Sequence, residues 1–530
     1  MASAQLYLAV AVILLSFIFL TKRSTNKSKF SSLPLPPGPP TLPILGNVHQ
    51  APKSHQWLQF HSWGKTYGPI VHLNMAGQSV IVLNSSKASH DLLAKHGATF
   101  SDRPRFVVAG DLALQGFHML LRPYDERFKL HQKLESPVLS EKSAKAYLPF
   151  QDLESKQLLW DILHSAADGD KAINCHDQIE RMTASIIYSL FYGHRVRTAK
   201  DPILLQAHAV NHEFDQLAQV GKYLVDSFPI LNKLPAILAP WKAEAAAHWK
   251  KQRALHVGNL ERGLNGSGWN MTKQMQQAVD SLKDIEMPPE ELALDIGIMA
   301  DAALDASSET LMWFVLGCIT DPGSGWMTKA QRDLDGVVGR KRLPSFEDRS
   351  KLPYIGAVVE ELLRWRPAGA AGVPHFTKVE SSYEGFRIPA NSVVIANHWG
   401  ISREKEVFGS DVERFLPERW LNGDGDLPTP AFGYGRRICP GRHVARNSLW
   451  IAVARLLWAF DIKPEVDEDG RAVEVDAKGT DGLVTKPLPF KARFELRGEW
   501  VRDVVEKECD TWRVDYHALL DQIALFSRNC

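Results

Sequence analysis

The sequence predicts a mainly α-helical protein with minor β structure, built as a single large domain. Apolar residues recur at helical spacing through most of residues 85–370, with Gly and Pro breaks between the segments. Residues rich in β-forming types are confined to short runs around 69–83, 379–396 and 483–496. No low-complexity linker and no internal repeat divides the 530 residues. The boundaries we expect are 1–21 for an N-terminal anchor, 22–40 for a hinge, 41–497 for the main domain and 498–530 for a tail of unknown role.

The composition narrows the classes of function. The chain has 62 basic and 61 acidic residues, so no global charge favours nucleic acid as a partner. Its five cysteines form no CxxC pairs, which argues against a disulfide scaffold or a zinc ribbon and is typical of a reducing compartment.

The N-terminal segment is predicted to anchor the chain in a membrane. Leu6 to Leu20 is apolar apart from Ser16, and a cluster of basic residues follows it. Basic residues on the C-terminal side predict that the rest of the chain faces the cytoplasm, and a cleaved signal peptide would carry them on the other side. The proline-rich run 33–40 then favours a stiff, extended spacer.

The next predicted elements are a hairpin and a long central helix. Residues 69–83 contain two β-rich runs around Ala-Gly-Gln. Pro288 and Pro289 with two following glutamates start a helix that continues to Ile319, about 45 Å long. Small residues in its middle would let a flat ligand lie against the backbone, and close packing against another helix explains them equally well.

Two later segments contain, respectively, a candidate ion pair and a candidate metal ligand. In the helix 351–367, Glu361 and Arg364 lie three residues apart on one face, and Arg419 further along offers a second cation. Residues 432–441 read Phe-Gly-Tyr-Gly-Arg-Arg-Ile-Cys-Pro-Gly and precede an apolar helix at 447–460. Glycines allow a backbone to come close to a cofactor, and a helix N-terminus with a nearby cation favours the thiolate of Cys439.

The spacing Phe-x-x-Gly-x-Arg-x-Cys-x-Gly closely resembles the haem-binding loop of the cytochrome P-450 (haem-thiolate) superfamily. The resemblance implies the cytochrome P-450 fold, with a long central helix over the haem and small antiparallel sheets. It implies haem b as cofactor, Cys439 as the axial ligand of the iron, and Phe432 and Gly441 as part of the cofactor-binding loop. It also implies that Glu361, Arg364 and Arg419 form a structural network that performs no chemistry.

Other roles are implied by aligning this chain with the family. Arg437 and His375 are candidate partners of the haem propionates. The early Trp-x-x-x-Arg pair of the family is replaced here by Phe128 and Gln132. Gln132 can still bind the cofactor through a neutral hydrogen bond, but we expect haem to be held less tightly. The small and apolar residues expected to line the substrate pocket are Ala302, Ala303, Ala370, Val373 and Leu483.

The family pattern Ala-Gly-x-Asp/Glu-Thr-Thr, laid on the central helix, makes Asp305 the acid. The alcohol that normally follows the acid is then replaced by Ala306, and Ser307 becomes the candidate hydroxyl. Efficient coupling of oxygen to product is therefore in doubt.

The function that the resemblance implies is a membrane-anchored monooxygenase of the endoplasmic reticulum. It would take electrons from NADPH through a separate flavoprotein reductase and oxidise a bulky, hydrophobic small molecule. The motifs look most like those of fungal members that act on alkaloids, terpenoids or polyketides of secondary metabolism. Ala306 leaves open oxidative coupling, rearrangement or the use of peroxide, and the altered early helix leaves open a non-enzymatic haem-binding or lipid-binding protein.

Overall fold

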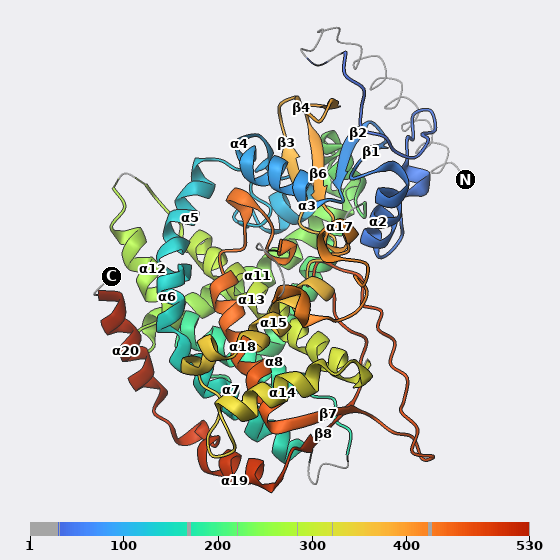
Figure 1. The fold of residues 1–530 in the computed structure, drawn as a ribbon. Coiled ribbons are helices and arrows are strands. Elements are labelled where there is room, and N and C mark those ends of the chain that lie inside the picture. The colour runs from blue at the N-terminus through green and yellow to red at the C-terminus, as the bar shows by residue number, and fades with distance from the viewer. Residues whose placement is uncertain are drawn as a thin grey trace.

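The computed structural model describes residue 30 and residues 32–166, 171–219, 221–283, 285–320, 322–421 and 427–528. The predicted anchor (residues 1–21) and the basic residues 22–29 lie outside these ranges. Within them the prediction of a mainly helical protein with small sheets is confirmed (Figure 1). The longer helices before the centre of the chain are α2 (Gln56–Tyr67), α5 (Glu126–Leu139), α7 (Leu148–Ser165), α8 (His176–Tyr192), α9 (Pro202–Leu217), α11 (Pro240–Asn265) and α12 (Met271–Asp280). The later ones are α13 (Pro289–Thr320), α14 (Trp326–Val337), α15 (Pro353–Trp365), α18 (Arg442–Ala459), α19 (Glu499–Glu508) and α20 (Tyr516–Arg528).

The sheets occupy the edges of the molecule. The predicted hairpin is present as β1 (Ile70–Met75) and β2 (Gln78–Leu83), and the turn places Ala76 and Gly77 at positive φ. In the largest sheet the order is β1-β2-β6-β3, with β3 at His375–Thr377 and β6 at Ser392–Ala396. The pairs β4 (Ser381–Tyr383) with β5 (Phe386–Ile388) and β7 (Phe460–Pro464) with β8 (Ala492–Leu496) are separate and antiparallel.

The largest sheet differs from the predicted antiparallel arrangement at one pairing. β2 and β6 pair in parallel. The two strands are about three hundred residues apart in the chain, so no short hairpin turn forces them to be antiparallel.

The helical core is built around α13. It packs against α8, α11 and α18, and its flanks contribute fully buried residues such as Phe314 and Leu316. α13 is long and apolar enough to span a membrane, but 72% of its most apolar window is buried inside the protein. Pro289 and the acidic Glu290 and Glu291 form its first turn, where the helix dipole favours negative charge.

The tail after residue 497 packs onto this core. Figure 1 shows α19 and α20 along the outside of the helical part, with α20 beside α6 (Glu141–Ala146). Val501 and Val505 are fully buried, and Trp512 stacks against Arg195 at 4.4 Å from the ring centroid. The tail is thus a part of the folded domain.

Candidate active site

The loop before α18 presents the thiol of Cys439 at the N-terminus of that helix. Its backbone N–H donates to the carbonyl of Phe432 at 2.8 Å, which closes the loop. Gly435 has a φ of 56°, and a Cβ there would lie 2.2 Å from the carbonyl oxygen of Leu93. Only glycine fits at this position because the backbone of the segment 90–95 touches the loop.

The surroundings of Cys439 influence its charge in opposite directions. Burial raises the pKa of the Cys439 thiol above its ordinary value, and the backbone N–H groups of Gly441 and Arg442 and the charge of Arg442 offset only part of this rise. These donors point at the sulfur from the first turn of α18, the end of the helix that favours an anion. The helix N-terminus and Arg442 thus favour a negative charge on the sulfur, which is partly accessible, and burial opposes it.

Three basic side chains gather beside this loop. Arg437 donates to the carbonyls of Ser101, Met119 and Arg122, at 2.8, 3.2 and 2.6 Å. Nδ1 of His375 donates to the carbonyl of Phe100 at 2.7 Å.

Arg103 is the third member of this group and is buried as well. It donates to the carbonyls of Val373 and Pro374. Burial and the neighbouring Arg437 lower the pKa of Arg103, and burial lowers the pKa of Arg437 to about 10. Among the described residues neither guanidinium forms a salt bridge. A buried cationic pair of this kind suits a ligand that carries carboxylates.

The helix α5 faces the same loop through Phe128 and Gln132. The ring of Phe128 lies 3.7 Å from the guanidinium of Arg437, and Gln132 donates to the carbonyl of Arg436 at 2.9 Å. Both residues therefore contact the Cys439 loop and help to position it. The positive charge beside this loop comes from Arg437 and Arg103, and not from a residue of α5.

The structure brings Glu361, Arg364 and Arg419 together. Arg364 donates to both carboxylate oxygens of Glu361 at 2.8 Å, and Arg419 donates to one of them at 3.1 Å. The indole of Trp420 and the backbone N–H of Leu416 complete the set at 3.0 and 2.8 Å. Because Glu361 and Arg364 are fully buried, every donor and acceptor here needs its partner.

The middle of α13 has an accessible face inside an otherwise buried helix. Residues 291–297 and 308–319 are buried, but between them all residues except Ala300 and Leu304 remain at least partly accessible. Ala302 is exposed, and Ala303 is half-buried. The middle of α13 is therefore less closely packed than its two ends, and its side chains there include several alanines.

Asp305 and Ser307, the predicted acid and hydroxyl, lie on different sides of α13. They are two residues apart and point about 200° apart around the helix. Asp305 lies 3.6 Å from the Nζ of Lys486 and 3.8 Å from Nδ1 of His208.

Glu309 and Thr310 lie at the end of the accessible window and were missed in the sequence. The hydroxyl of Thr310 donates to the carbonyl of Ala306 at 2.6 Å, and Glu309 is 2% exposed. The residues Ala306-Ser307-Ser308-Glu309-Thr310 also fit the acid–alcohol pattern, one helical turn after the register that ends at Ser307. This later register places a threonine directly after the acid, where the earlier one has Ala306, and that threonine is the signal in the sequence that could have found it.

The remaining predicted pocket residues come from two segments that touch. Ala370 is buried and accepts a hydrogen bond from the backbone of Trp399, and Val373 accepts one from Arg103. A Cβ on Gly369 would meet the carbonyl of Leu483 at 3.9 Å, so the segment after α15 and the loop before β8 lie side by side. Leu483 itself is 38% exposed.

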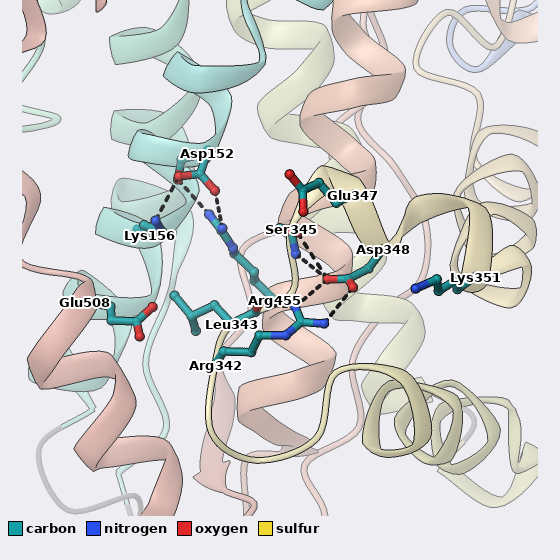
Figure 2. A pocket seen from close by; sticks show the side chains of 10 residues that line it. All are labelled: Asp152, Lys156, Arg342, Leu343, Ser345, Glu347, Asp348, Lys351, Arg455 and Glu508. Carbon is teal, nitrogen blue, oxygen red and sulfur yellow. Dashed lines mark hydrogen bonds and ion pairs between the residues drawn. The ribbon is translucent and has the colours of Figure 1, made fainter.

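A separate surface pocket of about 430 Å³ lies away from Cys439, where α7, α18 and the tail meet (Figure 2). Arg455 points at Asp152, and Arg342 forms two hydrogen bonds of 2.7 Å with Asp348. The arginines of this pocket are thus paired with its own aspartates. Such pairing is typical of a solvated groove and not of a binding site for a charged ligand.

The residues around Cys439 fit a haem. The thiol supplies a soft ligand at a helix N-terminus, the buried Arg103 and Arg437 suit two propionates, and the small residues of α13 leave room for a flat ring. Arg103 was missed in the sequence because a single arginine between Asp102 and Pro104 has no distinguishing pattern.

Comparison with known proteins agrees with this site. A family model described as Cytochrome P450 matches residues 36–494. Cytochrome P450 monooxygenase aneD of Aspergillus aculeatus is 38% identical over 92% of this chain and 93% of its own. FrzL of Cladobotryum sp. is 36% identical over 98% and 97%, and astF of Aspergillus oryzae is 32% identical over 99% and 96%; both are named cytochrome P450 monooxygenases. The chain therefore belongs to the cytochrome P450 family of haem-containing oxidoreductases.

Proposed function

We propose that this protein is a haem-thiolate monooxygenase that oxidises a hydrophobic small molecule in a fungal secondary-metabolite pathway. The observation that carries the proposal is the Cys439 thiol at the N-terminus of α18, with the N–H groups of Gly441 and Arg442 directed at its sulfur. The names and the fungal sources of the relatives support the same class of reaction.

Different residues of the site would bind different parts of a haem. A haem bound here would supply the activation of dioxygen, and thiolate ligation favours O–O cleavage. Cys439 would hold the metal, and Arg103, Arg437 and His375 would hold the propionates. Phe128 packs against Arg437 and keeps its guanidinium in place.

We assign the delivery of protons to Glu309 and Thr310. The hydroxyl of Thr310 is fixed by the carbonyl of Ala306, and the buried carboxylate of Glu309 lies next to it in the sequence. The two residues are about 100° apart around the helix, so a carboxylate and a hydroxyl flank the edge of the accessible window. Asp305 and Ser307 lack this arrangement.

The assignment of Thr310 and the burial of Arg103 weaken the grounds for the two alternative functions. Oxidative coupling, rearrangement or peroxide use was favoured only by the missing alcohol at Ala306, and Thr310 supplies a hydroxyl one turn later. A non-enzymatic haem-binding or lipid-binding protein was favoured by the altered α5, and Arg103 offers a buried cation there.

Electrons would come from NADPH through a flavoprotein reductase that docks near the Cys439 loop. Arg436 is exposed there, and the exposed Lys133 of α5 extends the basic surface. Lys129 and Arg446 are instead paired, with Glu126 at 2.6 Å and with Glu360 at 2.7 Å. An acidic partner would complement this surface.

We also propose that the protein sits on the endoplasmic reticulum membrane with its catalytic domain in the cytoplasm. The apolar segment Leu6–Leu20 and the basic residues after it support this location. The segment between α9 and α11 exposes apolar side chains as well: Leu224 is 70% and Ile237 90% exposed. Such side chains would be stable in contact with lipid.

The test is a reduced carbon-monoxide difference spectrum of the full-length protein. We expect the band of a thiolate-ligated haem, and we expect Cys439→Ser to lose it. Cys318→Ser is the matched control, since Cys318 is buried in α13 without a place in the loop. NADPH oxidation by the protein with a reductase then tests the enzyme class. A haem without the thiolate band would overturn the proposal.

A further inference from the structure

One edge of α13 carries two carboxylates that converge on a single lysine. Asp305 and Glu309 are one helical turn apart, and Nζ of Lys486 lies 3.6 Å from the first and 3.4 Å from the second. Asp305 also faces His208, whose Nε2 lies 2.9 Å from Glu180. Glu309 is the buried member of the pair of carboxylates, with 3% of its side chain exposed.

The position of Lys486 is fixed by its own loop. Thr480 donates its backbone N–H to the carbonyl of Lys486 at 2.7 Å, and the N–H of Lys486 donates to the hydroxyl of Thr480 at 3.1 Å. The indole N–H of Trp313 in α13 donates to the carbonyl of Thr485 at 3.1 Å, and this hydrogen bond connects the loop to α13. The lysine therefore reaches the edge of α13 from a clamped backbone.

A histidine approaches the same carboxylate from the side of α8. Nε2 of His176 lies 3.2 Å from Oε1 of Glu309, and 33% of the His176 side chain is exposed. The charged groups that face His176 are Glu309 from α13, Glu180 from α8 and Lys486 from the loop. The hydrogen bond with Glu309 raises the pKa of His176. A solvent-reaching imidazole is thus bonded directly to the buried acid.

We propose that His176 is the entry point through which protons reach Glu309, and that Lys486 keeps Glu309 ionised between transfers. The inference rests on the function proposed above, in which Glu309 and Thr310 deliver protons. In the transfer, the Nε2–H bond of His176 breaks and an O–H bond forms at Oε1 of Glu309. The imidazolium and the carboxylate are both neutralised. Solvent water returns a proton to the imidazole, and Glu309 becomes a carboxylate again when it passes its proton toward Thr310.

His176 acts through Glu309, so its test needs readouts that a structural role would leave unchanged. His176→Gln keeps an N–H donor for Glu309 but cannot exchange protons at neutral pH. His194→Gln is the matched control: His194 is 30% exposed and lies 3.1 Å from Asp201, just beyond the opposite end of α8. Both variants are assayed as haem-loaded full-length protein with reductase, NADPH and oxygen, in H₂O and in D₂O.

The expected result is a drop of about tenfold in proton-limited NADPH oxidation for His176→Gln, with a larger solvent isotope effect. In the wild type this rate should fall as pH rises through the pKa of His176, and the variant should lack that step. A second readout needs no turnover: the histidine ring signal assigned by His176→Gln should titrate at lower pH once Glu309 is changed to Gln.

Two outcomes would overturn the relay. One is a pH profile and an isotope effect of His176→Gln that match those of the wild type and of His194→Gln. The other is a His176 titration that does not respond to Glu309→Gln. If the wild type shows neither the thiolate band nor NADPH oxidation, the proposed function is wrong. The relay, which rests on that function, is then wrong as well.

Discussion

Replacing Glu361 by Gln tests whether the buried charge network holds the domain together. The Glu361 carboxylate accepts five hydrogen bonds, three of them from the guanidiniums of Arg364 and Arg419. Glutamine has nearly the same shape, but it removes the negative charge and turns one acceptor into a donor that faces other donors. Arg364 is 0% exposed and would be left without a counter-charge.

The expected cost follows from that burial. Breaking a buried ion pair by removing one partner costs about 3–5 kcal/mol. Because folded domains are stable by about 5–15 kcal/mol, the variant would lose about a fifth of its stability or more. The neighbouring Glu360 is the matched control: it pairs with Arg446 at 2.7 Å, both side chains are about a quarter exposed, and Glu360→Gln should cost less than about 1 kcal/mol.

The assay is urea unfolding of both variants followed by far-UV circular dichroism, together with haem content after purification. We expect Glu361→Gln to unfold at clearly lower urea and to retain little haem, and Glu360→Gln to behave like the wild type. The reasoning would be refuted if the two variants unfolded at the same urea concentration, because the network would then contribute no more than a surface pair.

Three further predictions concern the site, its pH dependence and the tail. Thr310→Ala should raise the peroxide formed per NADPH several-fold, measured with a peroxidase assay, whereas Ser307→Ala should leave it unchanged; the opposite order would contradict our assignment of the hydroxyl. Burial disfavours the charged form of His131, but Asp295 and Glu291 outweigh this and raise its pKa to about 9. Since that folded value exceeds the ordinary 6.5, the stabilisation is complete below pH 6.5 and lost as pH rises through about 9, and thermal melts of His131→Gln should lack this decline. Trp512→Ala removes the ring that three arginines face, and we expect a loss of about 1–2 kcal/mol in urea unfolding; an unchanged midpoint would mean that the tail contributes little.

The hairpin at 70–83, the helix α13 and the Cys439 loop could be predicted because each is encoded by neighbouring residues. Turn residues between two β-rich runs specify a hairpin, and prolines with acidic residues mark a helix start. The tail was harder, because its charged sequence hides Val501 and Val505, which become buried only when α19 packs on α7.

We place the acid–alcohol pair one helical turn later than the register expected from the sequence, at Glu309 and Thr310. The residue after each acid already differs in the sequence, since a threonine follows Glu309 and an alanine follows Asp305. Packing adds a second difference: Glu309 is buried beside Thr310 at the end of the accessible window, while Asp305 lies 3.8 Å from His208 and 3.6 Å from Lys486.

The sequence by itself determined the fold class and the family and made Cys439 the candidate metal ligand, because the spacing around Cys439 and the periodicity of α13 are local properties. The tertiary structure decided which charges are buried and which residues share a face. Arg103 and Arg437 are more than three hundred residues apart in the chain, and their joint burial beside the Cys439 loop exists only in the folded protein. The same holds for His176, Lys486 and Glu309, which three separate elements bring within hydrogen-bonding or ion-pair distance.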